Sequence, residues 1–292
     1  MQTPAPTFDY PANVPREINP EQYRSLGQLF DEAFKRYADR PFSVCMETWM
    51  SYGELDRQSK ALGAWLQSLG LAPDARVAIM LPNLPQFAVT MSAVLRAGYT
   101  CVNVNPLYTA RELEHQLKDS GATVIVILEN FCSTLEKILE RTPVKHIVVT
   151  AIGDMLGGLK GALTTMAVRH LKKLVPPYKL PLDNGRTVTP FPRAMSEGRG
   201  RALAADRSTL DSIAFLQYTG GTTGLSKGAV LSHRNIIAAT LQAEAWFTPA
   251  LARAGDLAKV NSIAALPLYH IFALTLCLLA IRQGSHLTLI PN

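Results

Sequence analysis

A run of glycine, threonine and lysine residues from Gln217 to Gly228 carries the clearest chemical signal in the sequence. It reads Gln-Tyr-Thr-Gly-Gly-Thr-Thr-Gly-Leu-Ser-Lys-Gly and lies between two short apolar runs, which predicts a loop that joins two strands. Glycines let the backbone approach an anion closely, threonine hydroxyls donate hydrogen bonds, and Lys227 adds a mobile positive charge. We therefore predict a phosphate-binding loop.

Lys227 is the residue on which this prediction depends most. An ammonium about 4 Å from a phosphate oxygen contributes roughly 4 kcal/mol at an effective dielectric constant near 20. Replacing this lysine should therefore weaken nucleotide handling. The predicted phosphate-binding residues are Tyr218, Thr219, Gly220, Gly221, Thr222, Thr223, Gly224, Lys227 and Gly228.

A Walker A loop is the nearest alternative for this run. That loop needs glycine directly before the lysine, serine or threonine directly after it, and a helix that begins there. Here Ser226 precedes Lys227, Gly228 follows it, and the next residues are typical of a strand, so we reject this alternative. The alternative of a flexible surface loop, rich in glycine and threonine and without function, is not excluded by the sequence.

The composition is that of a globular protein with a sizeable core. The chain has 292 residues, of which 48% are hydrophobic and 18% charged. Its net charge of +6 suits anionic partners such as nucleotides, coenzyme A or lipid headgroups, and no helix-turn-helix or zinc spacing supports nucleic acid. Four scattered cysteines without a Cys-x-x-Cys motif predict buried free thiols in a reducing compartment and no metal site: Cys45, Cys101, Cys132 and Cys277.

Alternating strand and helix patterns must position the loop. Residues 1–24 predict an extended arm, and residues 25–150 predict an α/β unit whose parallel sheet is flanked by helices. Two capping boxes mark helix starts in this unit, Ser51 with Glu54 and Thr109 with Glu112. Predicted strands span residues 42–46, 77–81, 100–104, 124–128 and 146–149, and predicted helices span residues 26–37, 52–69, 85–97, 110–120 and 132–140.

Residues 151–192 interrupt this alternation with a basic amphipathic insertion and a proline-rich linker. Apolar residues from Met155 to Leu174 recur at helical spacing, and Lys160, Arg169, Lys172 and Lys173 lie on or beside the other face. Such a helix can rest on an anionic membrane surface, and the alternative is that its apolar stripe packs against the core.

Residues 193–292 form the segment that contains the phosphate-binding loop. A helix capped by Ser232 or Asn235 follows the loop, and His233 is interpreted as a structural residue at its exposed start. Residues 262–281 carry no formal charge and are long enough to span a bilayer. Because Pro267 and the Tyr269-His270 pair divide them, we favour a buried strand over residues 260–266 and a buried helix over residues 271–282, closed by Gly284.

Two further positions are interpreted from their place at the end of a strand. Asn103 to Pro106 form either a ligand-facing loop or a turn built for its own sake. His270 follows the strand at residues 262–266, which favours a pocket role over that of a satisfied structural histidine.

The run from Tyr218 to Gly228 resembles the phosphate loop of the AMP-forming acyl-activating superfamily, with Ser226 where proline is often found. Two other stretches resemble bacterial long-chain fatty acid CoA ligases: Asn103 to Leu113 and Pro267 to Phe272. The likeness extends from about Ser25 to the last residue. It implies ATP, Mg²⁺ and coenzyme A as cofactors and co-substrates, with Lys227, Thr219 and His270 as catalytic residues, the last bordering the acyl pocket.

The resemblance also implies a reaction. A carboxylate attacks the α-phosphorus of ATP, pyrophosphate leaves, and the coenzyme A thiol then attacks the acyl-AMP; the catalyst needs charge screening and geometry rather than a side-chain nucleophile. Family elements expected after Asn292 lead us to predict the N-terminal portion of a ligase about twice this length, inactive alone. We expect it in the cytoplasm or peripheral on the inner face of the membrane, as a homodimer when full-length. Ligation of another carboxylic acid and a non-catalytic lipid-surface or adaptor role remain the alternatives.

Overall fold

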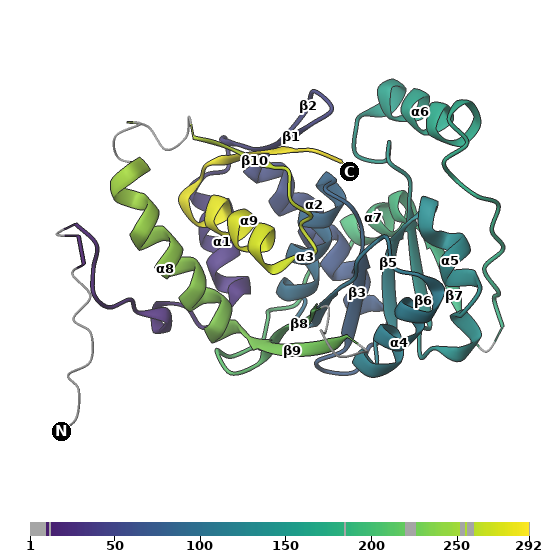
Figure 1. Ribbon diagram of the computed structural model, residues 1–292, viewed down its shortest axis with the longest axis horizontal. Helices are drawn as coiled ribbons and strands as arrows, with labels where there is room; N and C mark the ends of the chain where they lie inside the picture. Colours follow the sequence, from purple (N-terminus) through teal and green to yellow (C-terminus); the bar gives the residue numbers. More distant parts are fainter. Residues whose placement is uncertain are drawn as a thin grey trace.

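Two β-sheets organise the computed structural model, which describes residues 10–11, 13–183, 185–219, 226–251, 255 and 260–291. The larger sheet has seven strands in the order β7-β6-β5-β3-β4-β8-β9 (Figure 1). Every neighbouring pair is parallel except β8 and β9, which form an antiparallel hairpin. The predicted parallel sheet is therefore confirmed. Its strands are β3 (Arg76–Met80), β4 (Thr100–Asn103), β5 (Val124–Leu128), β6 (His146–Thr150), β7 (Thr187–Pro190), β8 (Ile213–Thr219) and β9 (Lys227–Ser232).

The smaller sheet joins the first strands of the chain to its last. Its order is β10-β11-β1-β2, and β11 is parallel to both β1 and β10, with Ser43 opposite Leu287. The antiparallel strand β2 and the edge strand β7 of the larger sheet have no clear sequence signal, because four residues each leave little periodicity. The strands are β1 (Pro41–Cys45), β2 (Thr48–Ser51), β10 (Asn261–Ala264) and β11 (His286–Leu289).

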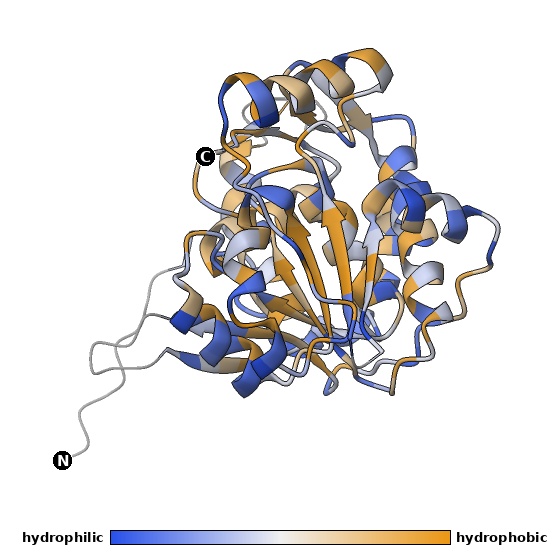
Figure 2. Ribbon diagram, turned by 90° about the vertical axis from the view of Figure 1, so that its right-hand side faces the viewer, coloured by the Kyte–Doolittle hydropathy of each residue, from blue (hydrophilic) through white to orange (hydrophobic). Residues whose placement is uncertain are grey.

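Helices cover both faces of the larger sheet, whose strands alternate between two hydrophobic cores. Val77 and Ile79 face a core shared with α1, α2, α3, α7, α9 and the smaller sheet, whereas Ala78 and Met80 face α4 and α5. Figure 2 shows the central strands as hydrophobic bands between more polar helices. The helices are α1 (Leu26–Arg36), α2 (Tyr52–Ser68), α3 (Pro85–Arg96), α4 (Ala110–Ser120), α5 (Cys132–Glu136), α6 (Gly158–Met166), α7 (Phe191–Arg199), α8 (His233–Leu251) and α9 (Ile271–Gln283).

Local sequence sets several helix ends as predicted. Both capping boxes are present: the Ser51 hydroxyl accepts from the Glu54 amide at 3.1 Å, and Thr109 with Glu112 forms the same reciprocal pair. Gly121 follows α4 with φ of 64°, a left-handed angle that suits a residue without Cβ. These helix starts and stops therefore depend on residues within one turn of the helix end.

The predicted buried strand at residues 260–266 is wrong in its burial. Strand β10 spans Asn261–Ala264, and of these residues only Ala264 is buried. Ile263 and Leu266 are 64% and 54% exposed. The reason is that successive side chains of β10 point to opposite faces of the smaller sheet, and the face of Ala264 is the one that packs against the core. Among the helices of the described residues, none combines the length and the apolar character needed to cross a bilayer.

Most of the apolar stripe of the 151–192 insertion lies away from the core, although Leu156 is buried and Met155 packs against the core. The segment forms α6 and a π-helical turn at Ala167–Leu171, and Figure 1 shows α6 standing beside the main body. Gly161 approaches the loop so closely that a Cβ there would lie 2.2 Å from the Gly153 carbonyl oxygen, and Arg169 binds Glu129 through two nitrogens. Because these contacts direct the glycine side inward, several large residues face solvent: Leu159, Leu163, Met166, Leu171 and Leu174.

Candidate functional site

The β8–β9 hairpin carries the predicted phosphate-binding residues to one edge of the larger sheet. Thr219 lies opposite Lys227, and both side chains are exposed at the last described pair of the hairpin. Of the other predicted ligands, Gly220, Gly221, Thr222, Thr223 and Gly224 lie outside the described residues. The structure thus pairs an exposed threonine with an exposed lysine at the end of the β8–β9 ladder.

Tyr218 and Gly228 face each other across the hairpin and depend on one another. A Cβ at Gly228 would lie 3.0 Å from ring carbons of Tyr218, so glycine leaves room for the phenol. The Tyr218 hydroxyl donates to Asp119 Oδ2 at 2.5 Å, and burial, reinforced by this carboxylate, raises the pKa of Tyr218. The tyrosine side chain is therefore packed against α4, which leaves its backbone as the part that can face a phosphate.

Helix α4 holds the hairpin from the side. His115 and Asp119 are four residues apart on one helical face, where His115 Nε2 donates to the Ser226 carbonyl at 2.9 Å and Asp119 accepts from Tyr218. Burial raises the pKa of Tyr108, just before α4, and the nearby Ser226 side chain opposes this effect. Sequence reasoning missed His115 and Asp119; their i, i+4 spacing on the helix that follows the Asn103–Pro106 turn was the available signal.

The two asparagines of that turn have different roles. Asn105 Oδ1 accepts from the Leu107 amide at 2.9 Å, which is a local turn contact. Asn103 is buried and donates through Nδ2 to Gln217 Oε1 at 3.0 Å. The interpretation as a turn therefore fits Asn105, whereas Asn103 connects β4 to strand β8 of the hairpin.

His270 lies at the N-terminus of α9 and is exposed. Its Nδ1 accepts a hydrogen bond from the Phe272 amide at 3.3 Å, so the ring caps the helix and the neutral form carries its proton on Nε2. Gln217 Nε2 donates to the carbonyl oxygen of Tyr269, the preceding residue, at 2.9 Å. The fold thus brings the hairpin of the larger sheet next to the Pro267–His270 turn, which follows β10 of the smaller sheet.

The apolar residues that follow His270 belong mainly to the core. Phe272 is 68% exposed, whereas Ala273, Leu274, Cys277 and the residues to Ile281 are buried. Exposed Ile263 and Leu266 lie on or just after β10. The larger part of α9 is therefore structural, and only its first turn with the end of β10 presents apolar surface.

His233 is buried, and the prediction of an exposed position is wrong. It is 1% exposed because α1 covers the start of α8, and its Nδ1 accepts from the Leu26 amide at 3.0 Å. Burial lowers the pKa of His233 to about 4, and nearby Asp206 opposes this effect. The residue is structural, as interpreted, but as a neutral acceptor at the N-terminus of α1.

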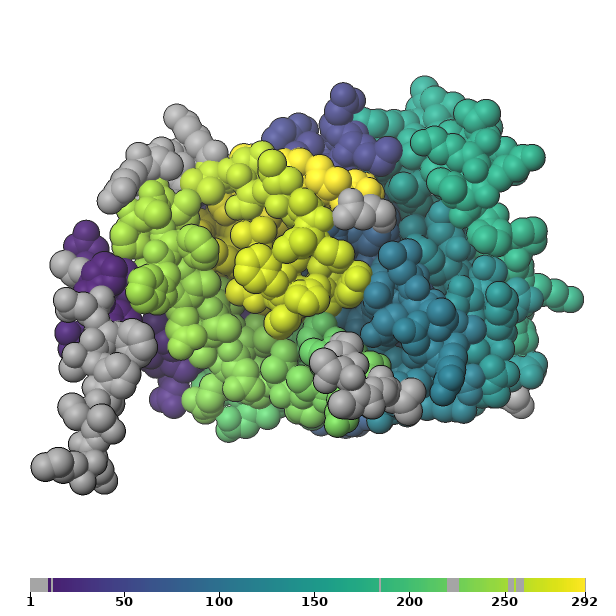
Figure 3. Space-filling model, viewed as in Figure 1, coloured from purple at the N-terminus to yellow at the C-terminus, as the bar shows by residue number. Residues whose placement is uncertain are grey.

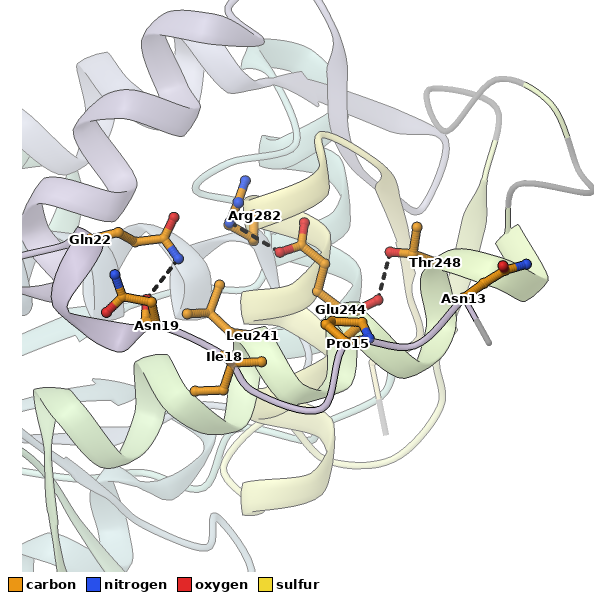
Figure 4. A pocket seen from close by; sticks show the side chains of 10 residues that line it. Asn13, Pro15, Ile18, Asn19, Gln22, Leu241, Glu244, Thr248 and Arg282 are labelled. Atoms are coloured by element: carbon orange, nitrogen blue, oxygen red, sulfur yellow. Dashed lines mark hydrogen bonds and ion pairs between the residues drawn. The ribbon is translucent and has the colours of Figure 1, made fainter. Parts of the chain in front are cut away.

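A separate cleft of about 290 Å³ lies between the N-terminal segment and the helices α8 and α9. Figure 4 shows Pro15 and Ile18 on the segment facing Leu241 and Glu244 of α8, with Arg282 on α9. Figure 3 shows the N-terminal segment, α8 and α9 side by side on one surface. The cleft contains neither the hairpin nor the Pro267–His270 turn, so we do not assign it to the candidate site.

The sequence matches a family of known enzymes over most of its length. Residues 30–292 match the model of the family described as AMP-binding enzyme. The chain belongs to this family. It is 48% identical over 285 residues to the long-chain-fatty-acid–CoA ligase of Salmonella typhimurium, and 44% identical over 287 residues to that of Haemophilus influenzae. These alignments cover 97% of this chain but 49% and 50% of the relatives, so the chain spans about half their length.

Solved structures of AMP-binding enzymes have the same fold. A long-chain-fatty-acid-CoA ligase from Archaeoglobus fulgidus aligns with a TM-score of 0.72 at 22% identity, covering 97% of this chain and 50% of that one. An anthranilate CoA ligase in complex with anthranoyl-AMP aligns with a TM-score of 0.71 at 17% identity, covering 94% and 47%. At these identities the likeness confirms the α/β fold with helix-flanked sheets.

Proposed function

We propose that this chain forms the phosphate-binding part of a long-chain fatty acid CoA ligase. The observation that carries the proposal is the exposed pair Thr219 and Lys227 at the mouth of the hairpin, joined through Gln217 to the turn that carries His270. The identity of 48% to a long-chain-fatty-acid–CoA ligase supports the choice of acid. The glycines between Thr219 and Lys227 add backbone donors suited to phosphate.

The proposed reaction requires the protein to offset the negative charges of the carboxylate and of ATP. A fatty acid carboxylate oxygen forms a bond to the α-phosphorus of ATP while the bond to pyrophosphate breaks, and the coenzyme A thiol then displaces AMP. The positive charge of Lys227 reduces the repulsion between the carboxylate and the phosphates of ATP, and the Thr219 hydroxyl donates a hydrogen bond. Because Nδ1 of His270 accepts from the Phe272 amide, Nε2–H is the donor of this exposed ring that remains for the acyl-AMP.

We assign no Mg²⁺ ligand among the described residues. No three histidine, cysteine, aspartate or glutamate side chains of that part of the chain are grouped to hold a metal ion. Mg²⁺ prefers oxygen ligands and often binds through substrate phosphates. We therefore propose that Mg²⁺ arrives bound to ATP, and we assign no step to a protein-held ion.

Replacement of Lys227 tests the proposed function. In the full-length protein, Lys227→Ala should lower the rate of fatty-acid-dependent ATP–pyrophosphate exchange by about 10²–10³-fold, since roughly 4 kcal/mol of charge attraction is lost. The control is Lys137→Ala, which removes an exposed lysine at the end of α5 and should leave the rate unchanged. Exchange that survives in Lys227→Ala would contradict the proposal, and a panel of aromatic and amino acids would show whether another acid is preferred.

The exposed face of the insertion favours a second, compatible role at an anionic membrane surface. Leu159 and Leu171 are 77% and 81% exposed, and Lys172 and Lys173 make no ion pair with any described residue. Burial of one leucine side chain contributes about 1.5–3 kcal/mol, and one lysine near anionic lipid adds about 1 kcal/mol. We propose that this face rests on the inner leaflet, where fatty acids are dissolved.

Vesicle co-sedimentation tests this surface role. The protein should bind vesicles of phosphatidylcholine with phosphatidylglycerol, and Leu159→Gln with Leu171→Gln should weaken binding at least tenfold. The matched control is Leu107→Gln, which changes a leucine that is 82% exposed outside the insertion. Equal binding by all variants, or none by the wild type, would exclude the role. Binding without any ATP affinity would instead favour a non-catalytic lipid-surface protein.

The cellular setting and assembly are part of the same proposal. All four cysteines are free and buried, and burial raises the pKa of Cys45 to about 11 and those of Cys132 and Cys277 to about 12. Protonated buried thiols are inert, which agrees with a cytoplasmic protein. We expect a homodimer for the full-length protein, which light scattering would test.

A further inference from the structure

The side chain of Gln217 links the hairpin strand to the turn that carries His270. It is 4% exposed and lies on β8 two residues before Thr219. Its Nε2 donates to the Tyr269 carbonyl at 2.9 Å, and its Oε1 accepts from Asn103 Nδ2 at 3.0 Å. Because a carbonyl can only accept, the direction of both bonds is fixed.

Asn83 holds the same turn from another side. It is 1% exposed and follows β3, just before α3 begins at Pro85. Its Nδ2 donates to the carbonyls of Ala264 and Leu266 at 2.8 and 2.9 Å, and its Oδ1 accepts from the Leu268 amide at 2.7 Å. One buried side chain therefore satisfies three backbone groups between β10 and α9.

These contacts cross between the two sheets. Strands β3 and β8 belong to the larger sheet, whereas β10 belongs to the smaller one, and within the described part of the chain no strand pairing joins the two sheets. The position of His270 relative to Lys227 is thus set by side-chain amides rather than by a β-ladder. Loss of one amide would leave a buried backbone carbonyl without its donor, and a displacement of about 1 Å is enough to impair a reaction that depends on alignment.

We infer that Asn83 and Gln217 are positioning residues that fix the His270 turn against the phosphate-binding hairpin, so that the acid meets the nucleotide in a set geometry. The inference rests on the proposed function. Neither side chain is exposed enough to contact the substrates, so both act through the backbone of residues 264–270. Loss of either side chain should therefore impair the use of the fatty acid more than the binding of ATP.

Steady-state kinetics of the full-length protein separate positioning from a merely structural role. Gln217→Met and Asn83→Leu should lower kcat/KM for the fatty acid at least tenfold, while KM for ATP changes less than threefold. The matched control is Gln86→Met: Gln86 is fully buried on α3 and donates to Thr150 and Ala151, away from the turn. It should lower stability without this split, and the same split in the control would overturn the inference.

The isosteric variant Gln217→Glu supplies a rescue experiment. A protonated glutamate can donate to the Tyr269 carbonyl and accept from Asn103 as glutamine does, whereas the ionised form cannot donate. A buried carboxyl retains its proton to higher pH than an exposed one. The activity of the variant relative to wild type should therefore rise severalfold as the pH is lowered from 8 to 6, and a flat ratio would count against the inference.

Hydrogen exchange gives a readout that does not need activity. In Asn83→Leu the Leu268 amide should exchange at least tenfold faster, and in Gln217→Met the peptide covering residues 267–271 should lose protection. If the wild-type protein shows no acid-dependent exchange of pyrophosphate, the proposed function fails while this measurement still decides the linkage. Unchanged protection in both variants would refute the positioning role itself.

Discussion

Single residues of this chain are fixed by partners that lie far away in the sequence. His233 accepts from Leu26, 207 positions earlier, and Tyr218 donates to Asp119 from 99 positions away. The residue types of the glycine, threonine and lysine run are enough to predict Lys227 and Thr219 as phosphate-binding residues, and this role stays a prediction. The charge state of His233 could not, because it depends on a helix that the local pattern does not place.

Burial of His233 predicts a loss of stability at mildly acidic pH. Its pKa is lowered from 6.5 to about 4 in the folded protein, so the unfolded chain binds more protons between these values. The free energy of unfolding should therefore fall as the pH drops, by about 2 kcal/mol between pH 7.5 and pH 5. Urea unfolding at both pH values measures this. In His233→Gln the fall should be smaller by that amount, and in His170→Gln, at an exposed position, it should persist; an equal fall in all three proteins would contradict the assignment.

Helices and strands were predictable where their signals are local. Capping boxes and glycine stops depend on neighbours within one turn, and both kinds of signal give the observed helix ends. Burial was less predictable: in β10 only Ala264 is buried, because the other face of the strand does not pack against the core, and α6 turns its glycine side inward. Sequence periodicity states which residues share a face, whereas the neighbour that covers a face is a tertiary property.

Gly284, which ends α9, packs against Tyr37 of a distant segment, and this contact can be tested by mutation. Gly284 has φ of 70°, and a Cβ there would lie 2.6 Å from ring carbons of Tyr37. Gly284→Ala should lower the free energy of unfolding by about 2–4 kcal/mol, from the left-handed backbone and the clash together. Gly70→Ala is the matched control, since φ is 66° and no atom lies within 4 Å of its Cβ. It should cost about 1–2 kcal/mol, and equal losses would show that the ring simply moves aside.

The whole molecule interleaves early and late segments of the chain. Strand β11 pairs with β1 in the smaller sheet, and β8 with β9 completes the larger sheet beside β4. Each sheet therefore draws strands from both the 25–150 and the 193–292 segments. Alternation of strands and helices predicts a parallel sheet, but which distant strands pair depends on the complete fold, so sequence periodicity could not supply it.

Tyr52 connects these distant segments and predicts how they unfold. It is fully buried at the start of α2, and its hydroxyl lies 2.6 Å from the Ala280 carbonyl and 2.7 Å from that of Ser285, so one proton is shared between two acceptors. Tyr52→Phe should lower the free energy of unfolding by about 1–3 kcal/mol because buried acceptors lose their donor. Tyr99→Phe is the control, as Tyr99 is 8% exposed and its hydroxyl bonds no described residue. If the sheets unfold together, hydrogen exchange in Tyr52→Phe should accelerate equally in β5 and β11, whereas acceleration confined to β11 would show that the smaller sheet opens alone.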